Sequence, residues 1–109
     1  MQRKLVPSGN GWALYMPKDL LKLLGYSPEN TTLLLQMNDN VLKISEVDIR
    51  KTDKNVLLKS LNKNGNGYGI YLSNSVIQLL EIKPEADEIK YTVKGNILLI
   101  EKAQNVIAV

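Results

Sequence analysis

Hydrophobic and polar positions follow one pattern along this chain, and the pattern occurs twice. In each half, a short stretch leads to a Gly-Asn-Gly turn and then to an apolar stretch, at 12–16 and at 68–72. Leucine-rich helical spacing follows, and each half ends in stretches that alternate apolar and polar residues, as at Ile89, Tyr91 and Val93. A period of two residues is typical of strands and a period near 3.6 of helices. Each half is therefore predicted to contain four short strands and one two-turn helix.

The two halves match each other when the sequence is shifted by 56 positions. Residues 3–46 and 59–102 then agree at 12 of 44 positions without a gap. The identical pairs include Gly9-Asn10-Gly11 with Gly65-Asn66-Gly67, Tyr15 with Tyr71, Leu23-Leu24 with Leu79-Leu80, and Leu42 with Leu98. A unit of this size buries little surface alone, so we expect the two repeats to share one core. The predicted boundaries are repeat 1 at 1–46, a linker at 47–56, repeat 2 at 57–102 and a short tail at 103–109.

Each repeat is expected to begin with one strand, at 2–6 and at 57–62, and to close with a hairpin. Asn38-Asp39-Asn40 and Lys94-Gly95-Asn96 supply residues that tolerate the positive φ of tight hairpin turns.

The two helices are expected to start and stop with different residues. Pro17 suits a first helical position, because its fixed φ and missing N–H cost nothing there, whereas Ser73 can cap its helix through the hydroxyl. Gly25 is a plausible C-terminal stop, and its counterpart Glu81 is a weaker one. The apolar helical faces are predicted to consist of Leu20, Leu21, Leu23 and Leu24, and of Val76, Ile77, Leu79 and Leu80.

Composition narrows the function classes. The chain has 109 residues with no cysteine and no histidine, so it lacks the usual residues of thiol, serine-triad and zinc chemistry. We therefore expect a protein that is not an enzyme and that has no cofactor or metal site. The longest apolar runs, 33–35 and 97–100, are too short to span a bilayer, and residues 1–5 lack a signal-peptide pattern. The expectation is a cytoplasmic protein without a membrane segment.

The order of motifs resembles the SpoVT/AbrB-like swapped-hairpin family, which includes AbrB-type regulators and MazE-type antitoxins. The resemblance covers nearly the whole chain, closely over 3–46 and more loosely over 59–102. The residues that carry it are Gly9, Asn10, Pro17, Lys18, Leu20, Leu21, Leu24, Gly25, Pro28 and the 41–44 strand, with Gly65, Asn66, Leu80 and Pro84 in the second copy. The second copy departs at Ser73-Asn74, where the family usually has Pro-Lys, and at Glu81 in place of glycine.

The resemblance implies a fold and a function. The expected fold is mostly β with two short helices, a swapped-hairpin AbrB-like β-barrel that one chain forms as an intramolecular pseudo-dimer. The family binds double-stranded DNA through the first hairpin and its loop, with basic and amide side chains. The implied function is sequence-specific transcriptional regulation.

The charge distribution agrees with a DNA partner. The net charge is only +3, but residues 1–18 contain Arg3, Lys4 and Lys18 and no acid. Residues 54–80 likewise contain three lysines and no acid. Side by side, the two first hairpins would form one basic face suited to phosphates. The predicted DNA-binding residues are Arg3, Lys4, Asn10, Trp12, Lys18, Lys59, Lys63, Asn64 and Asn66.

Several alternatives stay open. The Gly-Asn-Gly segments are either phosphate cradles or plain turns, and Trp12 and Tyr68 either stack on nucleic acid or pack at strand starts. Tyr15 and Tyr71 are expected in the core or at its rim, and acid pairs such as Asp87-Glu88 on a solvated surface. The alternative functions are an antitoxin that binds a toxin protein and autoregulates, and a module that forms homo-oligomers without DNA.

Overall fold

The computed structural model describes residues 2–27, 32–46 and 57–103, with the backbone alone at Leu57 and Asn64. The predicted linker at 47–56 and residues 104–109 of the predicted tail lie outside this range. The strands are β1 (Gln2–Arg3), β2 (Val6–Ser8), β3 (Gly11–Met16), β4 (Thr32–Asn38), β5 (Val41–Glu46), β6 (Leu57–Ser60), β7 (Asn62–Asn64), β8 (Gly67–Leu72), β9 (Ile89–Lys94) and β10 (Ile97–Lys102). The helices are α1 (Lys18–Leu24) and α2 (Asn74–Leu79). The predicted class, mostly β with two short helices, is confirmed.

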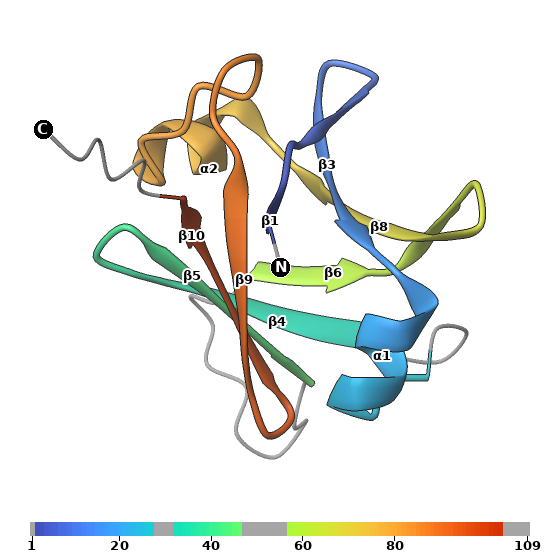
Figure 1. The fold of residues 1–109 in the computed structure, drawn as a ribbon. Coiled ribbons are helices and arrows are strands. Elements are labelled where there is room, and N and C mark those ends of the chain that lie inside the picture. Colours follow the sequence, from blue (N-terminus) through green and yellow to red (C-terminus); the bar gives the residue numbers. More distant parts are fainter. Residues whose placement is uncertain (1, 28–31, 47–56, 104–109) are drawn as a thin grey trace, which may run out of the picture.

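The strands form two antiparallel sheets (Figure 1). One has six strands in the order β1-β9-β10-β5-β4-β6, and the other has four in the order β2-β3-β8-β7. Side chains alternate along each strand, so one face of each sheet contributes to the core. One continuous cluster of buried residues joins both sheets and both helices; it includes Leu14, Ile70, Ile44 and Ile100, all fully buried.

The strand pairing follows the internal repeat. The β2–β3 pair has its counterpart in β7–β8, and the β4–β5 hairpin has its counterpart in β9–β10. In the centre of the four-stranded sheet, Leu14 of β3 lies opposite Ile70 of β8, which is its own repeat counterpart. Lys43 of β5 likewise lies opposite Leu99 of β10 in the six-stranded sheet. Each sheet therefore joins the two repeats at its centre.

The first strand of each repeat pairs with the other repeat. β1 pairs with β9, and β6 pairs with β4 in the same register shifted by 56 residues. The sequence predicted one continuous strand at 2–6 and another at 57–62, and both predictions were wrong. The chain breaks at Lys4-Leu5 and at Leu61, where it leaves the six-stranded sheet and enters the four-stranded one. Leu5 is buried and Leu61 packs against the core, so an apolar side chain packs inward at each point where the chain changes sheet.

The helices begin and end largely as their sequences predict. Ser73 is the N-cap of α2, and its hydroxyl accepts a hydrogen bond from the Val76 N–H at 3.4 Å. Pro17 was predicted at the first helical position; its ψ of 152° is extended, so it is the N-cap and the helix begins at Lys18. Leu23 and Leu79 were predicted on the buried faces but are exposed. A helical face about 100° wide is typically buried, and these two leucines lie at its margin.

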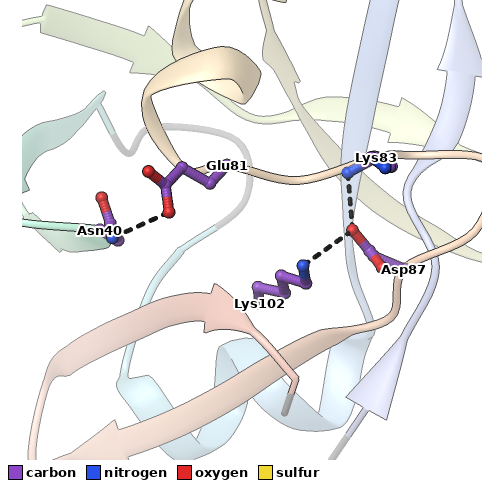
Figure 2. A network of polar contacts seen from close by, with 5 residues as sticks. All are labelled: Asn40, Glu81, Lys83, Asp87 and Lys102. Carbon is purple, nitrogen blue, oxygen red and sulfur yellow. Dashed lines mark hydrogen bonds and ion pairs between the residues drawn. The ribbon is translucent and has the colours of Figure 1, made fainter. Parts of the chain in front are cut away.

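The two helices end differently. Gly25 follows α1 with φ of 78°, a left-handed conformation that glycine adopts without strain. Its counterpart Glu81 has φ of 58°, although its side chain disfavours that region. The Glu81 carboxylate accepts a hydrogen bond from Asn40 Nδ2 at 3.3 Å, across to the β4–β5 turn (Figure 2).

The loop before β9 is held by Asp87. Its carboxylate accepts the Lys83 backbone N–H at 2.8 Å and lies 3.6 Å from Lys102 Nζ (Figure 2). The hydrogen bond from the Lys83 backbone, with help from the charges of Lys102 and Lys83, holds the pKa of Asp87 below its usual value. Asp87-Glu88 lies at the surface as expected, since Asp87 is half-buried and Glu88 exposed.

Tyr26 connects the end of α1 to both closing hairpins. Its side chain is buried, and its hydroxyl lies within hydrogen-bonding distance of the carbonyl oxygens of Ile44, in β5, and Asn96, in the β9–β10 turn. Burial, with a smaller contribution from the charge of Glu46, raises the pKa of Tyr26 to about 12. Its repeat counterpart is Ile82, which has no hydroxyl, so this connection exists in only one repeat.

We predict that Glu81→Gly stabilises the protein by about 1 kcal/mol, because glycine removes the cost of the left-handed conformation. Gly25→Ala is the matched control. A Cβ there meets no atom within 4 Å, so it adds only the backbone cost and should destabilise by about 1–2 kcal/mol. Urea denaturation measures both. A Glu81→Gly variant less stable than the parent would contradict the prediction.

We predict that Tyr26→Phe costs about 1–2 kcal/mol at pH 7, because buried carbonyl groups lose their donor. The raised pKa means that the folded state keeps the phenol proton to higher pH than the unfolded state. The advantage of tyrosine is therefore constant below pH 10 and declines as the pH rises from 10 towards 12. Denaturation at pH 8 and pH 11 checks this, and a gap that widens with pH would refute it.

Candidate nucleic-acid interface

The two faces of β3 and β8 have different roles. Leu14 and Ile70 point into the core and are fully buried. Tyr15 and Tyr71 alternate with core residues along these strands, lie on the opposite face and are half-buried. They are repeat counterparts, and the register places Tyr15 opposite Gly69 and Tyr71 opposite Ala13. Small residues on the neighbouring strand therefore leave room for each ring.

Glycine at two further positions lets the rings lie close to the sheet. A Cβ added at Gly67 would lie 2.6 Å from the Tyr15 hydroxyl and 2.8 Å from the ring carbon that bears it. A Cβ added at Gly11 would lie 2.6 Å from the Tyr71 hydroxyl and also 2.8 Å from the backbone oxygen of Leu72. Distances below 3.0 Å are steric clashes, so both positions require glycine for the observed packing. Here the glycines of the Gly-Asn-Gly segments allow close approach of an aromatic side chain.

A cation lies over each tyrosine ring. The Arg3 Cζ is 4.7 Å from the centroid of the Tyr15 ring, and the Lys59 Nζ is 5.4 Å from that of Tyr71. Both distances are within the range of a cation–π interaction. Arg3 and Lys59 are repeat counterparts, so the two pairs are related by the same shift of 56 residues. We call the surface formed by Arg3, Tyr15, Lys59 and Tyr71 the cationic tyrosine face.

A groove of about 230 Å³ lies beside Tyr71 on this face. Strands from both repeats contribute to its walls, which are lined by Val6, Pro7, Ser8, Ala13, Asn62, Lys63, Gly69 and Tyr71. Lys63 is exposed, so its ammonium group is accessible to a ligand in the groove. No acidic side chain among the described residues forms an ion pair with Arg3, Lys59 or Lys63. The face and its groove thus offer three cations that are not paired with a carboxylate of that part of the chain.

A buried tyrosine of the six-stranded sheet is hydrogen-bonded to the backbone of the cationic tyrosine face. The Tyr91 hydroxyl, in β9, donates a hydrogen bond to the Tyr15 carbonyl at 2.8 Å. Burial raises the pKa of Tyr91, and the charge of Arg3 opposes this in part. The phenol therefore stays protonated at neutral pH and remains a donor. This contact fixes the backbone of Tyr15 relative to β9.

The structure brings some of the predicted residues together and not others. Arg3, Lys59 and Lys63 belong to the cationic tyrosine face or its groove. Lys4 is exposed at the corner before Leu5, and Lys18 is exposed at the start of α1; neither lines the groove.

The predicted asparagines lie along the first hairpins. Asn10 and Asn66 are exposed in the two turns, where Gly9 and Gly65 have the positive φ values. The Asn10 carbonyl accepts a hydrogen bond from Asn74 Nδ2 at 3.1 Å, which connects the first turn to α2. Asn64 lies in β7. A role for these residues in DNA binding stays a prediction.

Trp12 lies on the other face of β3 from Tyr15. It is partly buried and packs against the core, as does its counterpart Tyr68. Of the two readings left open by the sequence, packing at a strand start describes both side chains.

Tyr15 and Tyr71 are the part of the site that the sequence reasoning did not assign to DNA binding. A signal was present, because the same shift that aligns the two tyrosines also aligns Arg3 with Lys59. Residue spacing does not reveal that the start of each repeat passes from the six-stranded sheet to the four-stranded one. Arg3 and Lys59 lie just before this passage, and each of them lies over a tyrosine ring of the four-stranded sheet.

Comparisons with known proteins do not identify a family. A scan against protein-family models, a search of curated proteins and a search of solved structures each found no match to this chain. Within the described residues, no group of three or more acidic, histidine or cysteine side chains is placed to hold a metal ion. No helix there is long and apolar enough to cross a membrane.

We predict that Gly67→Ala destabilises the protein by about 1–3 kcal/mol, because the new methyl group displaces the Tyr15 ring. The Tyr15→Leu change should recover most of this loss, since the three atoms nearest to the new Cβ all belong to the Tyr15 side chain. The matched case is Gly11→Ala, which Tyr71→Leu should not rescue, because the Leu72 carbonyl oxygen remains 2.8 Å away. Thermal melting of the single and double variants tests the difference. Equal rescue at both sites would show that the packing is misassigned.

Proposed function

We propose that this protein binds double-stranded DNA through the cationic tyrosine face and regulates transcription, in the manner of AbrB/MazE-type proteins. The observation that carries the proposal is the pair of cation–tyrosine contacts, Arg3 on Tyr15 and Lys59 on Tyr71, one from each repeat. Cations on one surface attract phosphates, and strands and their turns can enter a DNA groove. Operation in the cytoplasm, where bacterial-type regulators meet DNA, is part of the proposal.

The proposal includes a finer description of the fold. In it, the two repeats correspond to the two chains of a swapped-hairpin dimer and form one barrel-like unit within a single chain. Two features support this description. β1 and β6 each pair with a closing hairpin of the opposite repeat, and β3–β8 and β5–β10 join the repeats at equivalent positions. In each repeat, some strands therefore pair with strands of the other repeat.

The two half-sites on DNA are expected to be unequal. Arg3 of repeat 1 corresponds to Lys59, and a guanidinium can bridge phosphate or guanine with two hydrogen bonds, whereas an ammonium group acts as a point charge. Pro7 corresponds to Lys63, and Val6 to Asn62. Repeat 2 therefore brings more polar groups to the groove beside Tyr71, and repeat 1 brings the arginine that lies over Tyr15. An imperfect palindrome is the kind of sequence that suits this arrangement.

We predict that selection from a random pool of duplex oligonucleotides enriches a short, imperfectly palindromic sequence. Fluorescence anisotropy on that duplex should give a log–log salt slope of about −4 to −5, as expected for roughly four to six phosphate contacts. Arg3→Ala with Lys59→Ala should weaken binding and reduce the slope by about 2, and Lys63→Ala by about 1.

The matched control is Lys94→Ala, which removes an exposed lysine at the distant β9–β10 turn and should leave the slope unchanged. Circular dichroism establishes that each variant is folded. Failure to enrich any sequence, or binding that is insensitive to salt, would overturn the proposed function. An equal effect of Lys94→Ala would show that the cationic tyrosine face is not the contact surface.

A further inference from the structure

Two leucines at equivalent positions are unusually exposed. Leu23 on α1 is 68% exposed and Leu79 on α2 is 60% exposed, the highest values among the large apolar side chains of the described residues. They are separated by the repeat shift of 56, so the same apolar protrusion occurs once in each repeat. Scattered surface leucines are common, but a matched pair on the two helices suggests a contact surface.

Leu23 borders a groove that is large enough for a side chain of another molecule. The groove has a volume of about 450 Å³ and is lined mainly by apolar groups, among them Pro17, Leu20, Leu23 and Val93. Its charged members are Arg3 and Asp19. A leucine side chain from a partner would lose its contact with water there and contact several apolar groups.

The two helices that carry these leucines differ in charge. On α1, Lys18 and Lys22 are exposed, with one acid, Asp19. The counterparts on α2 are the uncharged Asn74, Ser75 and Gln78, and the next charged residue along the chain is the exposed Glu81. Contact of α1 with a second α1 would bring lysines together, whereas α2 carries no charge of its own and is followed by Glu81, which is hydrogen-bonded to Asn40, so contact of α1 with α2 avoids this repulsion. The charges therefore favour α2 as the occupant of the groove.

The occupant must come from another copy of the chain. α1 and α2 lie at opposite ends of the molecule (Figure 1), so the α2 of the same chain does not reach the groove beside α1. A contact between two different surfaces leaves one surface of each kind free at the ends of the assembly. Further copies can therefore add at both ends, unless the rotation between neighbouring copies closes the assembly into a ring.

We propose that a second copy of this protein docks α2, with Leu79, into the α1 groove beside Leu23, and that copies associate head to tail. The contact shares Arg3 with the cationic tyrosine face, but it does not depend on the DNA proposal, because it needs no DNA. It can therefore be measured on the protein alone.

The test uses two variants that each block one end. Leu23→Asp places a charge in the α1 groove, and Leu79→Asp places one on α2; both side chains are exposed, so the fold should persist, as circular dichroism would check. In sedimentation and light scattering, the wild-type average mass should rise with concentration above the 12.2 kDa of one chain. Each variant alone should associate at least about tenfold more weakly. An equimolar mixture should form pairs and nothing larger, because each partner retains one complementary end.

The control is Leu58→Asp, which alters an exposed leucine of β6 outside both helices and should associate like the wild type. Three results would overturn the proposal: a wild type that is monomeric up to millimolar concentration, a Leu79→Asp variant that self-associates like the parent, or a mixture that remains monomeric. The second result would indicate that α1 pairs with α1.

Discussion

The antiparallel pairing of β3 with β8 is the constraint on which the rest of this structure depends. Leu14 and Ile70 lie opposite each other at its centre, both are fully buried, and each is the other's repeat counterpart. Backbone hydrogen bonds and apolar burial therefore act at the same place, where the two repeats meet. Because a unit of about 44 residues cannot bury enough apolar surface alone, this ladder lets two marginal units form one core.

The same ladder sets the chemistry of the outer surface. Side chains alternate across a strand, so once Leu14 and Ile70 face the core, Tyr15 and Tyr71 must face away from it. The antiparallel register then brings each ring over the small residues of the other repeat, and Gly11 and Gly67 give the rings their space. A shift of one residue in this pairing would exchange the two faces and destroy core and surface together.

Much of the fold follows from local sequence, and the failures have physical causes. The repeat, the turn glycines and the Ser73 cap are short-range features that residue type and spacing reveal. The break of the first strands at Leu5 and Leu61 is not local, since it depends on which of two sheets each end can pair with. The exposure of Leu23 and Leu79 likewise depends on how much of a short helix the sheets cover. For the same reason, the sequence located Arg3, Lys59 and Lys63 but not the tyrosines beneath two of them.

The pairing of β1 with β9 has a consequence for synthesis in the cell. Gln2 lies opposite Lys90, so β1 leaves the ribosome without its partner and waits until β9 has been made. Folding in which distant segments must meet is slow, because the entropy of closing large loops is lost before contacts compensate for it. The nascent chain therefore carries unpaired strand edges and uncovered leucines while the segment from β1 to β9 is being made. A chaperone that binds extended apolar segments would have its longest opportunity on this half-made protein.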